Sequence, residues 1–223
     1  MFAKLNFSRT GGFLVELLML VLGINIALWF EGQFQEYQDA KAEEAYLVGL
    51  RRDVLEDASS LERLANVNES RAGRLAGILD AMGTLRDMPD EEAVSMMFEV
   101  STYDFFVPED FTYRAMQESG DFSLLSDPDL KEALLRQHRR YKLIGTLEDN
   151  FLQALDDEYI PLLIRSVDLA AGRLVDRDIG ESVLARNMVA FTINETQART
   201  LQYRLAHEKA LELVGLIDSR LGH

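Results

Sequence analysis

The fold is decided by residues 13–30, which read FLVELLMLVLGINIALWF. Fifteen of these eighteen residues are apolar, and only Glu16, Gly23 and Asn25 interrupt the run. A helix of this length covers about 27 Å, close to the ~30 Å of a bilayer's hydrocarbon core. No later stretch of the chain is comparable, so we expect a single transmembrane helix here.

A cleavable secretory signal is the alternative to a permanent anchor. Such signals have an apolar core of about 7–15 residues followed by an A-x-A-like cleavage site. Here the core continues to Trp29 and Phe30, and the small-residue candidates Ala27 and Ala40 have Asn25 and Gln38, which are not small, two positions earlier. We therefore expect an uncleaved signal anchor.

The basic residues that flank the span predict its orientation. The basic residues Lys4 and Arg9 precede the span, whereas the twenty residues after it contain a single basic residue, Lys41. Because basic residues stay on the cytoplasmic side, we expect a cytoplasmic N-terminus and a large domain on the other side. The chain has no cysteine, which is compatible with either compartment.

Composition indicates a folded, acidic protein. The chain has 223 residues, of which 48% are hydrophobic and 27% charged, and its formal net charge is −15. This charge would repel phosphate groups, which argues against nucleic acid as a partner and against adhesion to an anionic lipid surface. The part of the chain beyond the anchor is long enough to form either one folded domain or a stalk followed by a domain.

We divide the chain into a tail (1–12), an anchor (13–30), a long helix or stalk (31–86) and a helical domain (87–223) that packs on the long helix. The long helix carries a stripe with alternating steps of three and four, typical of a buried helix face or a coiled coil. The stripe positions are Leu47, Leu50, Val54, Asp57, Leu61, Leu64, Asn68, Arg71, Leu75, Ile78, Met82 and Leu85. Alanines beside the stripe widen it, which favours core packing within the chain. A self-associating coiled-coil stalk, with Asn68 and Arg71 setting its register, is the alternative.

Helix signals continue through the rest of the chain, so the predicted fold class is all-α. We expect a break at 83–90, a helix to about 100, and an aromatic-rich segment at 98–122 that holds a short helix near 109–118. Asp127 or Ser126 and Pro128 begin the next helix, which continues past Gly145 and kinks or restarts at Pro161. After a loop at 168–180 we expect a short helix at 181–193, with a strand as the alternative, and a final helix that begins at Asn194 or Thr196.

No pattern in the sequence predicts catalysis, a cofactor or a metal. The histidines are His138, His207 and His223, and none lies one helical turn from another, as a local metal motif requires. There is no glycine-rich phosphate loop and no nucleophile elbow. The acidic clusters, such as Glu148-Asp149 and Asp156-Asp157-Glu158, are expected to be solvated helix faces. We therefore expect a protein that is not an enzyme.

Two groups of residues are candidates for binding. The first is the basic patch formed by Arg136, His138, Arg139, Arg140 and Lys142, which could receive an anion or an acidic partner. Pairing of these residues with acids of the same chain is the alternative. The second group, Gly23, Asn25 and Ala27 in the span, predicts association of anchors through close helix packing and amide hydrogen bonding.

Two segments carry a resemblance to a known family. The anchor runs directly into EEAYLVGLRRDVLED, and a later segment reads FTYRAMQESGDFSLLSDPDLKEALLRQHRRY. Together with the closing helix at about 198–221, they resemble a bacterial family of single-pass, membrane-anchored helical proteins known as a domain of unknown function. The resemblance implies this topology in a bacterial inner membrane and implies no activity.

Together these features predict a non-enzymatic, single-pass inner-membrane protein with a periplasmic helical domain. It would act as an oligomeric scaffold or as an accessory subunit of a larger membrane complex. Its expected partners are the lipid bilayer and either further copies of itself or another membrane protein. A periplasmic ligand-sensing module that signals through a partner is the alternative function.

Overall fold

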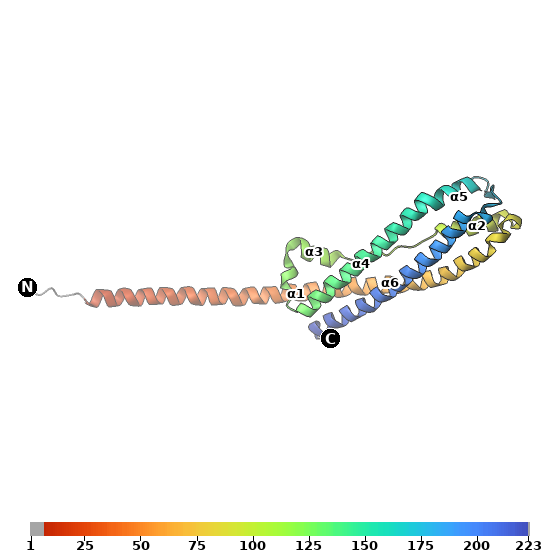
Figure 1. Cartoon of the computed structure of the whole chain (residues 1–223). Helices are drawn as coiled ribbons and strands as arrows, with labels where there is room; N and C mark the ends of the chain where they lie inside the picture. The colour runs from red at the N-terminus through yellow and green to blue at the C-terminus, as the bar shows by residue number, and fades with distance from the viewer. Residues whose placement is uncertain (1–6, 223) are drawn as a thin grey trace, which may run out of the picture.

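The computed structural model describes the backbone of residues 7–222 and the side chains of residues 16–222. Lys4 in the expected tail lies outside the described residues, and Arg9 is described only by its backbone. The chain is all-α with one two-stranded hairpin (Figure 1). Its elements are α1 (Phe7–Ala81), η1 (Met82–Asp87), α2 (Asp90–Ser101), α3 (Phe111–Ser119), η2 (Asp121–Leu124), α4 (Pro128–Ala154), η3 (Leu155–Tyr159), α5 (Ile160–Ser166), β1 (Val167–Asp168), β2 (Arg173–Leu174), η4 (Ile179–Glu181) and α6 (Val183–Leu221).

Helix α1 is one continuous helix of 75 residues that joins the apolar span to the folded domain. Its N-terminal part projects alone from the bundle, and every side chain from residue 16 to residue 38 is exposed (Figure 1). This part of α1 is the one described helix that is long and apolar enough to cross a membrane. Ala81 is the last residue of α1 and the 3₁₀ turn η1 follows from Met82, so the break expected at 83–90 begins one residue early.

Helices α1, α4 and α6 form the bundle (Figure 1). Helix α6 runs antiparallel to α1, since Arg51 pairs with Asp218, Ala58 with His207, and Arg71 with Thr196. Helix α4 lies beside α6, where Gln137 Nε2 donates to the Ala206 carbonyl. We call the end where α1 enters the bundle the base, which also holds α3 and the C-terminus, and the opposite end the tip.

The stripe, which runs along α1 and into η1, is buried against the chain's own helices. All twelve of its positions, from Leu47 to Leu85, are less than 9% exposed. The core that they help to form has three apolar clusters, one at the base, one in the middle and one at the tip. Of the two interpretations of the stripe, core packing within the chain is the one that the structure supports. The stripe presents no exposed seam through which a second stalk could pair with it.

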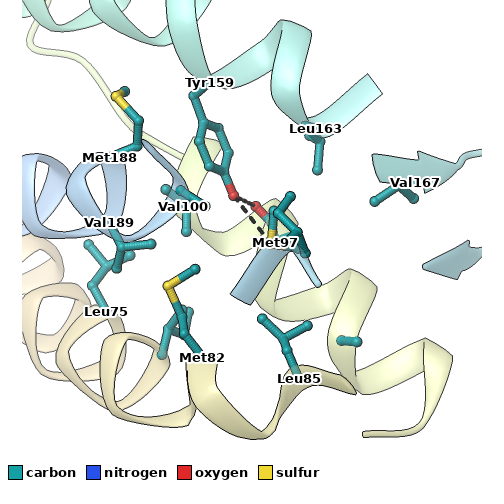
Figure 2. Close-up of a cluster of buried hydrophobic side chains, with 14 of the residues drawn as sticks. Leu75, Met82, Leu85, Met97, Val100, Tyr159, Leu163, Val167, Met188 and Val189 are labelled. Atoms are coloured by element: carbon teal, nitrogen blue, oxygen red, sulfur yellow. Dashed lines mark hydrogen bonds between the residues drawn. The ribbon is translucent and has the colours of Figure 1, made fainter. Parts of the chain in front are cut away.

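The tip cluster joins η1, α2, α5 and the start of α6. In Figure 2 the ring of Tyr159 points toward α2, and its hydroxyl donates a hydrogen bond of 2.6 Å to the Met97 carbonyl oxygen. Gly180 in η4 lies so close to η1 that a Cβ atom would be 2.0 Å from the Met82 carbonyl oxygen. Only glycine therefore permits η4 to pack here.

The helix boundaries in the middle of the chain follow the predicted signals. The Asp127 side chain accepts hydrogen bonds from Asp129 N and Leu130 N, and Pro128 is the first residue of α4. The helix continues past Gly145, and a π-helical turn, η3, connects it to α5, whose first turn holds Pro161. The expected loop at 168–180 contains the hairpin's turn and its second strand, β2.

The predicted break in the last helix is wrong. A single helix, α6, begins at Val183, where the Ser182 side chain accepts from Ala185 N, and it passes Asn194 and Thr196 without interruption. Thr192 and Thr196 are buried and face α1, so tertiary packing overrides the weak capping signal of these polar residues.

Candidate functional site

The three span residues do not share one face of α1. Gly23 and Ala27 lie one turn apart on the same side of the helix. Asn25 lies two residues from each of them, about 160–200° around the axis, and so projects from the opposite side. All three are exposed. Association through all three at once would need partners on both sides.

Asn25 already has a partner within its own helix. Its Nδ2 atom donates a hydrogen bond of 2.7 Å to the Val21 carbonyl oxygen, one turn earlier. Gly23 has open space around it, since no atom outside its own turn lies within 4 Å of the position of a Cβ. The geometry therefore favours the side of Gly23 and Ala27 for close approach of a second helix.

The basic patch on α4 is divided between different faces. Arg136 and Arg140 line a groove between α4 and α6, whereas His138 faces a cavity between α4, α3 and α1. Arg139 and Lys142 are exposed. The five residues therefore form no single anion site.

Acids of the same chain neutralise the groove beside Arg136. Arg136 Nη2 lies 2.5 Å from Glu132 Oε1, and across the groove Lys209 Nζ lies 2.5 Å from Glu212 Oε1. Asp129 also lines this groove. Of the five patch residues, Arg136 alone forms an ion pair with an acid among the described residues, so the intramolecular pairing that we gave as the alternative holds for Arg136.

His138 is stacked on an aromatic ring. Its imidazole lies 4.2 Å from the Tyr113 ring, measured between centroids, at an angle of 27°. Burial, followed by the charge of Lys142, lowers the pKa of His138. A neutral His138 thus contributes packing and a hydrogen-bonding edge, and adds no positive charge to the patch.

Buried polar groups form a layer between the middle and tip clusters. Its members are the buried side chains Asn68, Arg71, Thr192, Thr196 and Arg199. Arg71 donates to the Glu99 and Val100 carbonyl oxygens at 3.2 and 3.0 Å. Burial and the charge of Arg199 lower the pKa of Arg71 to about 10, so it remains a cation.

Arg199 is the most unusual member of this polar layer. Its side chain is 1% exposed, and its guanidinium carbon lies 4.1 Å from the centre of the Phe151 ring. Its Nη1 and Nη2 atoms have no hydrogen-bond partner among the described residues. The contact with Phe151 is a cation–π interaction, which offsets part of the cost of burying this charge.

Glu148 is the buried acid nearest this layer. It accepts hydrogen bonds from Phe106 N at 3.0 Å and from the Tyr203 hydroxyl. Burial raises the pKa of Glu148 despite these bonds. The expectation that the cluster Glu148-Asp149 is solvated is therefore wrong for Glu148, which faces the core one α4 turn from Ile144.

Two further buried acids lie nearer the base, on α1. Asp53 Oδ2 accepts from Thr112 N at 2.9 Å, and Asp57 Oδ1 accepts from Glu109 N at 2.7 Å. Burial raises the pKa of Asp57 to about 6. Of the buried polar groups, Asp57, Asn68 and Arg71 carried a signal in the sequence, since they interrupt an apolar stripe. Glu148 and Arg199 carried none.

In comparisons with known proteins, no family model, no curated protein and no solved structure matches this chain. The resemblance to a family of anchored helical proteins therefore stays a prediction. Function has to be argued from the geometry of the span and of the bundle.

Proposed function

We propose that this protein is a single-pass membrane protein whose span associates with another membrane helix and whose helical domain serves as a non-enzymatic scaffold. The second helix belongs either to another copy of the chain or to a larger membrane complex. The same helix, α1, carries both the span and the domain. From Phe30, at the end of the span, to Leu47, the first buried stripe residue, it rises about 25 Å.

One observation carries this proposal: the bundle buries its own core, whereas the described side chains of the span, residues 16–30, are all exposed. The apolar side chains from Leu17 to Phe30 are each exposed by nearly half or more. In water such a surface would be strongly unfavourable, whereas lipid or another helix would cover it.

The side of Gly23 and Ala27 is the proposed contact surface. Without a hydrophobic driving force in lipid, helices associate through close packing, which small residues one turn apart permit. Asn25 projects from the opposite side of α1, and one N–H of its Nδ2 already bonds to the Val21 carbonyl of the same helix. The sequence-based hypothesis is thereby narrowed from three residues to two.

The scaffold role is supported by the location of the perturbed groups. Asp57, Glu148 and Arg199 have shifted pKa values because they are buried in the bundle, where packing and hydrogen bonds within the fold account for their positions. Lys4 and Arg9 before the span support a cytoplasmic N-terminus and a periplasmic domain in a bacterial inner membrane. A reporter active only in the cytoplasm, fused after His223, tests this orientation and should be silent.

Native mass spectrometry of the full chain in mild detergent tests the association. The wild type should give a discrete multi-subunit mass or co-purify with a membrane protein, and Gly23→Leu should abolish either. Gly32→Leu is the matched control, because Gly32 lies about 180° around α1 from Gly23 and is equally open. A wild-type monomer without partners, or equal effects of the two substitutions, contradicts the proposal.

A further inference from the structure

An uncovered aromatic side of α1 continues from the span toward the bundle. Successive helix residues are 100° apart around the axis, so Phe30, Phe34 and Tyr37 lie within about 40° of Gly23. Their side chains are 63%, 62% and 67% exposed. From Gly23 through Ala27 to these three residues the steps alternate between four and three. We call Phe30, Phe34 and Tyr37 the aromatic face, which is the direct continuation of the proposed contact surface in the span.

The bundle approaches α1 from the side opposite the aromatic face. Glu43 Oε1 accepts from Ser126 N at 2.6 Å, and the Tyr46 hydroxyl donates to Asp121 at 2.6 Å. Both α1 residues lie about 140–160° around the axis from Gly23. The chain's own domain therefore leaves the aromatic face open, and Figure 1 shows this part of α1 projecting alone.

Lipid accounts poorly for the aromatic face. Tyr37 lies about 10 Å further along α1 than Phe30, whereas the headgroup layer is about 5–8 Å thick. Lipid also surrounds a helix on every side, so a headgroup belt needs no preferred direction. Here the other side of the same segment is polar, with Gln35, Glu36 and Asp39. A one-sided aromatic surface of this kind fits contact with a single partner helix.

The charge pattern around the aromatic face suits a second copy of the chain. Copies enter the membrane in the same direction, so two α1 helices would pair in parallel with equal residues at equal height. The flanking residues Gln33, Gln38 and Ala40 are uncharged, and only Glu31 at the edge carries a charge. Although the chain's net charge is −15, this surface is thus almost free of like-charge repulsion.

Beyond the aromatic face the same side of α1 becomes polar. Lys41 lies in line with Gly23, and Glu44 lies within about 60° of that line. Both side chains are exposed, and in a parallel pair Lys41 of each copy approaches Glu44 of the other. Their opposite charges then compensate. Further on, Arg52 and Glu56 are exposed on this side, so the apolar contact ends before the bundle begins to widen α1.

We propose that the second helix is α1 of another copy, and that the two helices pair in parallel from Gly23 through Tyr37. This inference rests on the proposed function, which it extends by naming the partner and continuing the contact outside the membrane. Alternating steps of four and three are those of a left-handed coiled coil. With axes 8–10 Å apart, equal Cα atoms would be about 5–6 Å apart at the aromatic face and about 12–13 Å apart at Gln35 or Glu36.

Disulfide crosslinking of the full chain in native membranes tests the pairing. The chain has no cysteine, so one introduced thiol reports only its distance from its counterpart. On oxidation with copper phenanthroline, Phe34→Cys and Tyr37→Cys should give a reducible dimer of twice the chain mass. Gln35→Cys and Glu36→Cys are the matched controls and should give at least about fivefold less, because disulfides bridge Cα atoms about 4.4–6.8 Å apart.

A second substitution separates specific pairing from chance collision. In the Tyr37→Cys chain, Phe34→Glu places a charge in the aromatic contact and should lower the dimer yield at least about fivefold. Gln35→Glu adds the same charge on the far side and should leave the yield unchanged. The bundle touches neither position, so both variants keep the folded domain. Equal effects of the two substitutions would overturn the pairing.

The remaining outcomes distinguish this inference from the proposed function. Equal yields from all four cysteine positions, or no dimer from Phe34→Cys and Tyr37→Cys, would overturn pairing with a second copy. If the Tyr37→Cys thiol gives no dimer and is shielded from a membrane-impermeant maleimide, lipid covers the aromatic face instead. If no dimer forms but Gly23→Leu still abolishes co-purification with another membrane protein, the proposed association stands and only its partner changes.

Discussion

Gly49 on α1 and Thr112 on α3 touch so closely that a Cβ atom on Gly49 would lie 2.8 Å from Thr112 Oγ1 and 2.9 Å from its Cγ2. Thr112 is buried, and its backbone N–H donates to Asp53 one α1 turn from Gly49. This contact is what brings α3 onto α1, where the two helices line the cavity beside His138.

Gly49→Ala should therefore destabilise the domain by about 1–3 kcal/mol, because Thr112 is short and β-branched and cannot turn aside. Gly77→Ala is the matched control on the same helix. Its Cβ would meet open space, so it should stabilise by about 0.5–1 kcal/mol through helix propensity. Urea unfolding measures both, and equal effects of the two substitutions would show that the contact with Thr112 does not constrain α1.

Arg199 should contribute to stability mainly through its packing. Its side chain covers Phe151, but its Nη1 and Nη2 atoms are unpartnered. Arg199→Met keeps most of the buried volume and should stay within about 1 kcal/mol of the wild type, whereas Arg199→Ala leaves a void and should lose about 3 kcal/mol. Equal losses in urea unfolding would instead assign the stabilisation to the guanidinium charge.

Asp57 should make the domain less stable as pH rises. Its pKa is raised from 3.8 to about 6, so between these values the folded state holds a proton that the unfolded chain has released. The free energy of unfolding therefore falls as pH rises through this window. Relative to the wild type, Asp57→Asn should gain up to about 3 kcal/mol between pH 4 and 7.

Urea unfolding in acetate and phosphate buffers measures this difference. Comparing the two proteins at each pH removes the contribution of other acids, including Glu148, whose pKa is also raised, and Asp53, whose pKa is lowered. A constant difference between pH 4 and 7 would mean that Asp57 titrates normally.

The parts of the fold that the sequence predicted well are those with a regular pattern. The stripe from Leu47 to Leu85 could be predicted from the spacing of its apolar residues alone. The start of α4 could be predicted from the strong capping signal of Asp127 and Pro128. The false break near Asn194 arose because its polar residues resemble a cap, whereas packing of Thr192 and Thr196 against α1 decides the helix.

The candidate sites were harder to predict because they depend on spatial neighbours. Neighbouring basic residues on α4 point to different faces of the helix. Their closeness in the sequence, at 136–142, therefore suggested a single basic surface that the fold does not form. The burial of Gln137 and Tyr141 depends on α1 and the segment at 109–113, which close over them. Their local sequence gives no sign of this arrangement.

The most direct test of the account is site-specific photo-crosslinking from the span in native membranes. Met19 and Ile26 lie within about 60° of Gly23 around α1, whereas Leu18 and Leu28 lie on the side of Asn25. A photoreactive residue at Met19 or Ile26 should give one discrete protein adduct, with a yield at least about fivefold above that from Leu18 or Leu28. Equal yields from both sides, or no protein adduct from either, would contradict association through Gly23 and Ala27.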